Sequence, residues 1–173
     1  MLKRIIVIIG PNGVGKTTTA VEFLNLCPNS AYIDADWCRC VNPFYPVTDA
    51  SHELFINNMF DLFKNHLLCQ DINVIVFPYA FHGSRKEILD LVIQRLKDAK
   101  IEFELKIIIL KCSYEENIRR ALQDNRDEER IKRGMRNTFT FYDNYNYPVI
   151  DTTELEPKQV VQEIIKVLNL QDK

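Results

Sequence analysis

The residues whose types and spacing point most clearly to chemistry lie near the start of the chain, where residues 10–17 read GPNGVGKT. This segment satisfies the pattern G-x-x-x-x-G-K-[ST] at every fixed position. Glycines let the backbone curl tightly, so that successive N–H groups converge on a phosphate. The lysine supplies a cation to the β- and γ-phosphate oxygens of a nucleotide, and the hydroxyl residue after it can bind Mg²⁺. The segment therefore predicts a phosphate-binding loop.

Within this loop we expect Lys16 to be catalytic as well as nucleotide-binding, and Thr17 to be a metal ligand. The nucleotide-binding residues that we predict here are Gly10, Asn12, Gly13, Val14, Gly15, Lys16, Thr17 and Thr18. The alternative is a glycine-rich turn that merely joins two elements. A turn of that kind would need neither the lysine nor the threonine, so phosphate binding is favoured.

Two carboxylates, Asp34 and Asp36, follow a short β-branched and aromatic run at residues 31–34. In an open α/β sheet, ligands bind beyond the carboxyl ends of the strands, which is where the phosphate loop also lies. One carboxylate could hold Mg²⁺ through water, and the other could accept the proton of an attacking hydroxyl. The alternative is that Asp34 caps the strand end and that Asp36 is a solvated loop residue.

Alternating strands and helices must position these residues, which predicts an α/β fold with three α/β/α layers and a mainly parallel sheet. The five strands that we expect cover residues 5–9, 31–34, 74–77, 102–110 and 148–150. We expect helices at residues 15–26, around 55–67, at about 115–136 and from Pro157 onward. A further helix is expected to begin at a capping box formed by Ser84 and Glu87. Pro78 is expected to end the third strand. We expect one domain over residues 1–173.

Composition narrows the function classes. Lys and Arg number 22 and Asp and Glu number 24, a formal net charge of −2 that argues against a non-specific nucleic-acid binder. The apolar run at residues 5–9 is too short for a signal sequence or a membrane span, so no membrane partner is expected. The five cysteines form an odd set without paired C-x-x-C spacing, which favours reduced thiols and a cytoplasmic location over a zinc or redox site.

The loop resembles that of the P-loop NTPases, and the short chain resembles their small-kinase branch of nucleoside-phosphate, shikimate-type and gluconate-type kinases and chloramphenicol phosphotransferase. The resemblance covers essentially the whole chain. It implies the strand order 2-3-1-4-5, the use of ATP and Mg²⁺, and a short helical lid at about residues 120–136. In these kinases an Asp-x-Asp stands at the place of Asp34 and Asp36. The resemblance thus implies that Asp36 is the base or acceptor-hydroxyl ligand and that Asp34 lies on the metal side.

One departure from the family concerns the third strand, which ends in Val76-Phe77-Pro78 and so lacks the aspartate that many P-loop enzymes carry there. This puts more weight on Asp34, or on Thr17 and water, for holding the metal.

The acceptor is expected to lie near the residues that follow the second and third strands. His82 could orient a hydroxyl or a phosphate, Tyr79 could stack on a ring, and Trp37 could wall the pocket or simply pack in the core. The substrate residues that we predict are Asp36, Trp37, Arg39, Tyr79 and His82. Arg39 and Arg85 are the only guanidiniums on this side between Thr17 and Leu91, which favours a neutral or hydroxyl-bearing acceptor over a monophosphate.

An arginine-rich stretch follows the fourth predicted strand. Arg126, Arg130 and Arg133 recur at i, i+4 and i+7 and so share one helical face. Arg126 and Arg130 resemble the lid arginines of small kinases and are expected to be catalytic, because they could neutralise charge on the transferred phosphoryl group. Arg120 could lie against the nucleotide base. The alternative is a solvated helix with many ion pairs, since acidic residues nearly balance the basic ones.

The leading hypothesis is an ATP-dependent kinase that transfers the γ-phosphoryl group of Mg·ATP to a small acceptor, such as a nucleoside, a nucleotide or another hydroxyl-bearing metabolite. The absence of an N-K-x-D motif favours ATP over GTP. Two alternatives stay open: a polynucleotide 5′-hydroxyl kinase and a non-catalytic module that senses ATP. We expect a monomer or a homodimer.

Overall fold

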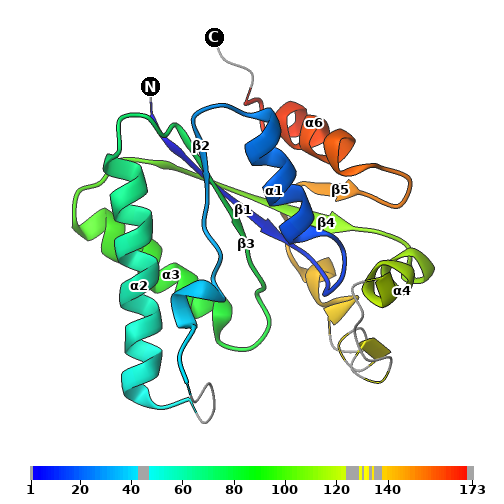
Figure 1. Ribbon diagram of the computed structural model, residues 1–173, viewed down its shortest axis with the longest axis horizontal. Helices are drawn as coiled ribbons and strands as arrows, with labels where there is room; N and C mark the ends of the chain where they lie inside the picture. Colours follow the sequence, from blue (N-terminus) through cyan, green and yellow to red (C-terminus); the bar gives the residue numbers. More distant parts are fainter. Residues whose placement is uncertain are drawn as a thin grey trace.

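The computed structural model describes residues 2–42, 47–123, 129, 131, 132, 134 and 138–170. Five strands form one parallel sheet in the order β2-β3-β1-β4-β5, as predicted (Figure 1). The strands are β1 (Arg4–Ile9), β2 (Ser30–Tyr32), β3 (Val74–Pro78), β4 (Glu104–Lys111) and β5 (Val149–Asp151). Because all five run in the same direction, their carboxyl ends share one edge of the sheet.

Helices cover both faces of the sheet, which confirms the predicted layered α/β architecture. In Figure 1, α1 (Lys16–Leu26) and α6 (Pro157–Val167) lie on one face, and α2 (Asp49–Leu68) and α3 (Arg85–Asp98) lie on the other. A further helix, α4 (Tyr114–Gln123), follows β4 at the carboxyl edge. Two short 3₁₀ helices, η1 (Trp37–Arg39) and η2 (Phe141–Asn144), also lie near this edge.

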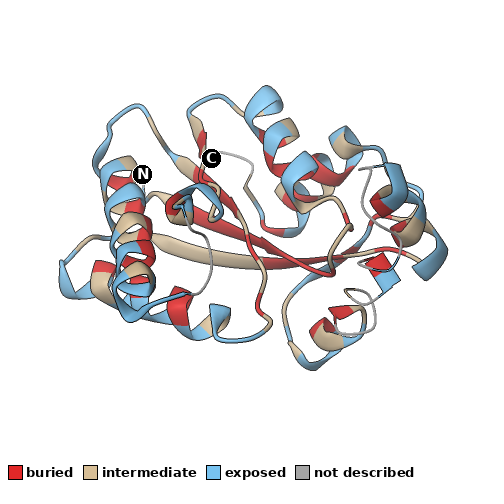
Figure 2. Cartoon of the chain, turned by 60° about the horizontal axis from the view of Figure 1, so that its bottom comes forward, coloured by how far each residue is buried: buried red, intermediate tan, exposed pale blue. Residues whose placement is uncertain are grey.

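The central strand β1 explains why the sheet is buried on both sides. Its residues Ile5 to Ile9 have no exposed surface (Figure 2). Alternate side chains point to opposite faces of a strand. Accordingly, Ile5, Val7 and Ile9 join the apolar cluster under α2 and α3, and Ile6 and Ile8 join the cluster under α1 and α6. A continuous apolar run is what a doubly covered parallel strand requires.

The structure corrects several of the predicted boundaries. β2 ends at Tyr32, so Asp34 lies beyond the strand, and β4 begins at Glu104. β3 includes Pro78, which the sequence led us to exclude. Since β2 pairs with β3 only as far as Val76, the missing N–H of Pro78 interrupts no ladder hydrogen bond on that side. Pro157 begins α6 at the position predicted.

The predicted capping box at the start of α3 is wrong. Ser84 is the N-cap residue, but within the described part of the chain its side chain makes no capping hydrogen bond. Its backbone φ of −79° and ψ of 7° differ from the extended conformation that a capping serine usually adopts, so the hydroxyl is not directed at the first turn. The helix therefore begins without a side-chain cap.

We predicted a helix over residues 115–136, and α4, from Tyr114 to Gln123, corresponds to the first part of it. The proposed catalytic residues Arg126 and Arg130 lie outside the described residues. Of the residues after α4, Ile131 is buried and clusters with Ala121, Ile118 and Phe139. No helix in the described ranges is long and apolar enough to cross a membrane.

Candidate functional site

The phosphate-binding loop connects β1 to α1 at the carboxyl edge of the sheet. Gly13 has φ +86°, and a Cβ atom added there would lie 3.2 Å from the Cβ of Ala121. Gly15 has φ +99° and is the N-cap of α1, with no side-chain capping hydrogen bond among the described residues. Positive φ values are unfavourable for residues with side chains. The first backbone N–H groups of α1 and the positive end of its dipole therefore face an open cleft that suits a phosphate.

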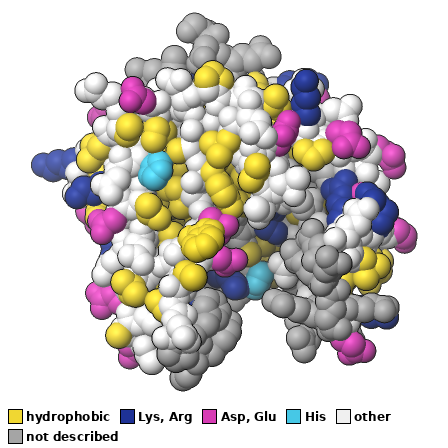
Figure 3. Space-filling view, viewed as in Figure 1, with side chains coloured by type: hydrophobic (Ala, Val, Ile, Leu, Met, Phe, Trp, Pro, Cys, Tyr) yellow, Lys and Arg dark blue, Asp and Glu magenta, His cyan; other side chains and the backbone are white. Residues whose placement is uncertain are grey.

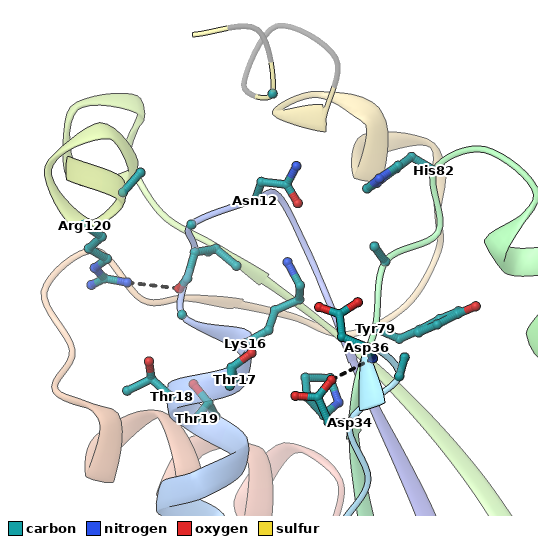
Figure 4. Close-up of a pocket in the computed structure, with 18 of the residues that line it drawn as sticks. Asn12, Lys16, Thr17, Thr18, Thr19, Asp34, Asp36, Tyr79, His82 and Arg120 are labelled. Atoms are coloured by element: carbon teal, nitrogen blue, oxygen red, sulfur yellow. Dashed lines mark hydrogen bonds between the residues drawn. The ribbon is translucent and has the colours of Figure 1, made fainter. Parts of the chain in front are cut away.

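Lys16 extends from the first turn of α1 over this loop. Its Nζ donates to the carbonyl oxygens of Gly10 and Pro11, each at 2.8 Å. In Figure 4 the ammonium group points into the space between Asn12 and Asp36. Thr17 and Thr18 are exposed at the start of α1, so their hydroxyls are accessible to a ligand. The residues predicted to bind phosphate are thus brought together at one site.

A tight turn after β2 places the two carboxylates. Asp34 accepts a hydrogen bond from the Tyr32 hydroxyl at 2.6 Å and another from the Asp36 backbone N–H at 2.8 Å. Burial and this bond to Asp34 raise the pKa of Tyr32, so its hydroxyl remains a donor. Asp34 therefore has the capping role that was left open as an alternative, while the exposed Asp36 carboxylate is directed toward the Lys16 side of the cleft (Figure 4).

Arg120 lies between the phosphate loop and the turn after β5. Its Nη1 donates to the Val14 carbonyl at 3.2 Å and to Thr152 Oγ1 at 3.0 Å, and its Nη2 donates to the Thr152 carbonyl at 2.7 Å. A charge-assisted hydrogen bond of 2.6 Å joins its Nε to Glu116. These bonds fix the guanidinium against the back of the loop, a role that we did not predict for it (Figure 4).

The segment after β3 forms the opposite wall of the cleft. Tyr79 is 4% exposed, and its hydroxyl has no hydrogen-bond partner among the described residues. Its ring stacks on Phe77 with centroids 4.8 Å apart. His82 projects into the cleft (Figure 4), and burial together with the charges of Arg85 and Lys16 lowers its pKa, so the imidazole is neutral near pH 7.

One continuous cleft of about 1450 Å³ joins these parts. It is lined by the phosphate loop, by Asp34 and Asp36, by Arg39, Tyr79 and His82, and by Arg120 and Thr152. Trp37 does not line it: this side chain is 76% exposed on η1. Figure 3 shows acidic, basic and histidine side chains meeting at the centre of this face.

The structure adds residues that the sequence did not reveal. Thr138 Oγ1 accepts a hydrogen bond from the Asn12 backbone N–H at 3.4 Å, and the hydroxyl of the buried Tyr142 accepts one from Phe81 N–H at 3.1 Å. These contacts join residues 138–142, which follow the predicted lid segment, to the phosphate loop and to the segment after β3. They span 126 and 61 positions, and no sequence pattern relates the partners.

The sequence matches the model of a family described as an AAA domain over residues 6–140. The chain belongs to this family. It also has the fold of the small P-loop kinases. A search of curated proteins found no match to the sequence.

Solved structures with this fold include several kinases. The tunicamycin resistance protein of Deinococcus radiodurans is 19% identical, with a TM-score of 0.66 over 96% of this chain and 95% of that one. The APS kinase of Mycobacterium tuberculosis, in complex with AMPPNP and APS, is 17% identical, with a TM-score of 0.60 over 97% and 98%. The shikimate kinase of Bacteroides thetaiotaomicron is 18% identical, with a TM-score of 0.56 over 98% and 99%. At these identities the likeness concerns the fold.

Proposed function

We propose that this protein is an ATP-dependent phosphotransferase that transfers the γ-phosphoryl group of ATP to a hydroxyl group of a small acceptor. The observation that carries the proposal is that one cleft contains both the phosphate-binding loop with Lys16 and the exposed carboxylate of Asp36. A module that only bound nucleotide would not need a free carboxylate facing the phosphate end of the cleft. The kinase fold of the structural neighbours supports this proposal.

The chemistry assigns a distinct role to each residue. The acceptor oxygen forms a bond to the γ-phosphorus while the bond from that phosphorus to the leaving oxygen of ADP breaks. Asp36 accepts the proton of the acceptor hydroxyl. Lys16 changes partners from the Gly10 and Pro11 carbonyls to the phosphate oxygens and stabilises their charge. The loop amides after Gly13 and Gly15 hold the phosphates that are not transferred.

The same residues suit a magnesium ion. Thr17 offers an exposed hydroxyl, and Asp34 offers carboxylate oxygens that each accept one hydrogen bond and retain a further lone pair. Hard oxygen ligands of this kind, completed by water and by phosphate oxygens, are those that Mg²⁺ prefers. When bound, Mg²⁺ supplies positive charge against the β- and γ-phosphates.

A transfer screen tests the proposal. Purified protein is incubated with Mg²⁺ and ATP labelled in the γ-phosphoryl group, together with nucleosides, nucleotides, sugars, sugar acids, aminoglycosides and oligonucleotides. We expect label to appear in one class of small acceptor, and the transfer to require Asp36. Tight ATP binding without transfer to any acceptor, with no effect of Asp36→Asn on binding, would identify a non-catalytic module instead. Transfer to oligonucleotide 5′ ends would identify a polynucleotide kinase.

A further inference from the structure

We propose that the buried hydroxyl of Tyr142 holds the segment after β3 (residues 79–84) at a fixed position relative to the phosphate loop, which makes Tyr142 a positioning residue for phosphoryl transfer. The inference rests on the proposed function, because it concerns the two walls between which the transfer would occur. It goes beyond that function by giving a role to η2, none of whose residues lines the cleft.

The segment after β3 leaves the sheet as it reaches the cleft. The Tyr79 N–H still donates to the Ile8 carbonyl of β1, at 2.8 Å. The next bond along this backbone within the described chain is donated by the Phe81 N–H to the Tyr142 hydroxyl, at 3.1 Å. Phe81 directly precedes His82, whose side chain projects into the cleft (Figure 4). The Tyr142 hydroxyl therefore holds the backbone at the point from which this wall reaches the cleft.

Packing alone does not require a hydroxyl at position 142. The Tyr142 side chain is 1% exposed and belongs to the apolar cluster under α2 and α3, with its ring centroid 5.2 Å from that of Phe141. A phenylalanine ring would fill nearly the same space. It would, however, leave the buried N–H of Phe81 without the acceptor that a buried backbone donor requires. The hydroxyl thus serves the backbone of the neighbouring segment.

The same stretch of chain also contacts the phosphate loop. Four residues before Tyr142, the buried Thr138 accepts a hydrogen bond from the Asn12 N–H at 3.4 Å. Burial raises the pKa of Tyr142, while hydrogen bonds with the Phe81 and Gly10 backbone lower it, so the first residue of the loop also lies beside this hydroxyl. Residues on one short stretch therefore contact both walls of the cleft.

Other side chains fix η2 itself. Asp143 forms an ion pair with Lys111 at the end of β4. Tyr145, which directly follows η2, packs edge-on against Phe81 with ring centroids 5.5 Å apart. None of these contacts involves the Tyr142 hydroxyl. Removing that hydroxyl should therefore leave η2 in place and release only the backbone that it holds.

The consequence concerns the geometry of the transfer. The nucleotide would be fixed by Lys16 and the loop amides, whereas the segment after β3 bounds the space left for the acceptor. Reacting atoms must lie about 3 to 3.5 Å apart and aligned, and a misplacement of about 1 Å can cost roughly a hundredfold in rate. A wall that moved relative to the loop would therefore lower kcat far more than it lowered nucleotide affinity.

Amide hydrogen exchange in the whole protein tests this support directly. ¹⁵N-labelled wild type, Tyr142→Phe and Tyr145→Phe are compared, each saturated with Mg·ADP so that the phosphate loop is occupied. We expect the Phe81 amide of Tyr142→Phe to exchange about tenfold faster, relative to Val7 in the central strand, because its acceptor is gone. Tyr145→Phe is the matched control, since it removes a hydroxyl from a ring that touches Phe81 without bonding its N–H. Its ratio should equal that of the wild type.

Transfer kinetics give the readout that a merely structural role would not change. With nucleosides, nucleotides, sugars and sugar acids as acceptors, we expect Tyr142→Phe to lower kcat by about tenfold to a hundredfold. The KM for ATP and the Kd of Mg·ADP should change by less than about threefold. Tyr145→Phe should keep the wild-type kcat. Thr138→Val removes the hydroxyl on the loop side and should weaken Mg·ADP binding by about threefold, with the exchange of Phe81 unchanged.

The outcomes separate this inference from the proposed function. An unchanged exchange ratio for Phe81 in Tyr142→Phe, or equal losses of kcat in Tyr142→Phe and Tyr145→Phe, would overturn the inference. So would a wild-type kcat in a Tyr142→Phe protein whose Phe81 amide exchanges faster. If the expected exchange pattern occurred in a wild type that binds Mg·ADP but transfers phosphate to no acceptor, the support by Tyr142 would stand and the proposed function would be overturned.

Discussion

The guanidinium of Arg120 donates a hydrogen bond to the carbonyl of Val14, 3.2 Å away and 106 positions earlier in the chain. The same guanidinium is bonded to Thr152, whose side chain is buried. The phosphate loop is therefore braced from behind by α4 and by the turn after β5. The contacts of Arg120 are to the carbonyls of Val14 and Thr152 and to the side chains of Glu116 and Thr152, so we expect it to act as a positioning residue.

Replacing Arg120 should loosen the loop. Arg120→Ala removes charge-assisted bonds to two carbonyl groups, so we expect the free energy of unfolding to fall by about 2 kcal/mol and ADP binding to weaken. Arg119→Ala is the matched control, because Arg119 pairs with Glu116 on the exposed side of α4 and its loss should cost less than about 1 kcal/mol. Chemical denaturation and calorimetric ADP titration measure both effects. Equal costs for the two variants would contradict the bracing role.

Lys16 is expected to be essential for transfer but not for folding. Lys16→Met keeps the aliphatic stem and removes the ammonium group that would stabilise the transferred charge. We expect kcat/KM to fall by about a thousandfold or more, equivalent to several kcal/mol. Coupled measurement of ADP release checks this, with Lys97→Met, at the far end of α3, as the control. Full activity in Lys16→Met would refute the proposed mechanism.

The two aspartates in the turn after β2, Asp34 and Asp36, are expected to have different roles, the first structural and the second chemical. Asp34→Ala leaves the Tyr32 hydroxyl and the Asp36 N–H without their acceptor, so we expect a loss of stability of about 1 to 3 kcal/mol. Asp36→Asn should leave the melting temperature unchanged and lower kcat by roughly a hundredfold to ten-thousandfold. Thermal unfolding and the transfer assay, run on both variants, test this division. A large loss of stability in Asp36→Asn would argue against it.

The approach of the phosphate loop to α4 makes Gly13 sensitive to substitution. In Gly13→Ala the new methyl group would crowd Ala121 and the Asn117 amide oxygen, in addition to the strain of φ +86°. We expect a cost of about 1 to 3 kcal/mol and weaker ADP binding. Gly83 has φ +65° with nothing within 4 Å of an added Cβ, so Gly83→Ala should cost about 1 kcal/mol. The ADP affinity of Gly83→Ala should equal that of the wild type. If Gly13→Ala and Gly83→Ala reduced the ADP affinity equally, the contact of Gly13 with α4 would be unimportant.

His82 gives the cleft a defined pH dependence. Burial, Arg85 and Lys16 lower its pKa from 6.5 in the folded protein, so the unfolded chain binds more protons than the folded one in this range. The contribution of the neutral imidazole to stability is complete above pH 6.5 and is lost as the pH falls through the folded-state pKa. We expect an NMR titration midpoint for His82 below 6.5. The free energy of unfolding should decline less between pH 7 and 5 in His82→Gln than in the wild type, and identical pH profiles would contradict this assignment.

Local sequence determined the strands, the phosphate loop and the chemistry expected of the residues in that loop. An uninterrupted apolar run such as Ile5–Ile9 is typical of a doubly covered strand, and the glycines of the loop pattern allow the positive φ values found at Gly13 and Gly15. The position of Asp36 at the cleft followed as well, because the carboxyl ends of parallel strands lie at one edge.

Only the tertiary structure decided which distant groups meet. The bond from Arg120 to Val14, the contact of Thr138 with Asn12 and the bond from the Phe81 N–H to the Tyr142 hydroxyl all join segments far apart in the chain. Such contacts depend on strand order and on helix packing, and they leave no periodic trace in the sequence. The exposure of Trp37 has the same origin, since whether an apolar side chain beside a cleft turns inward depends on the space that neighbouring elements leave.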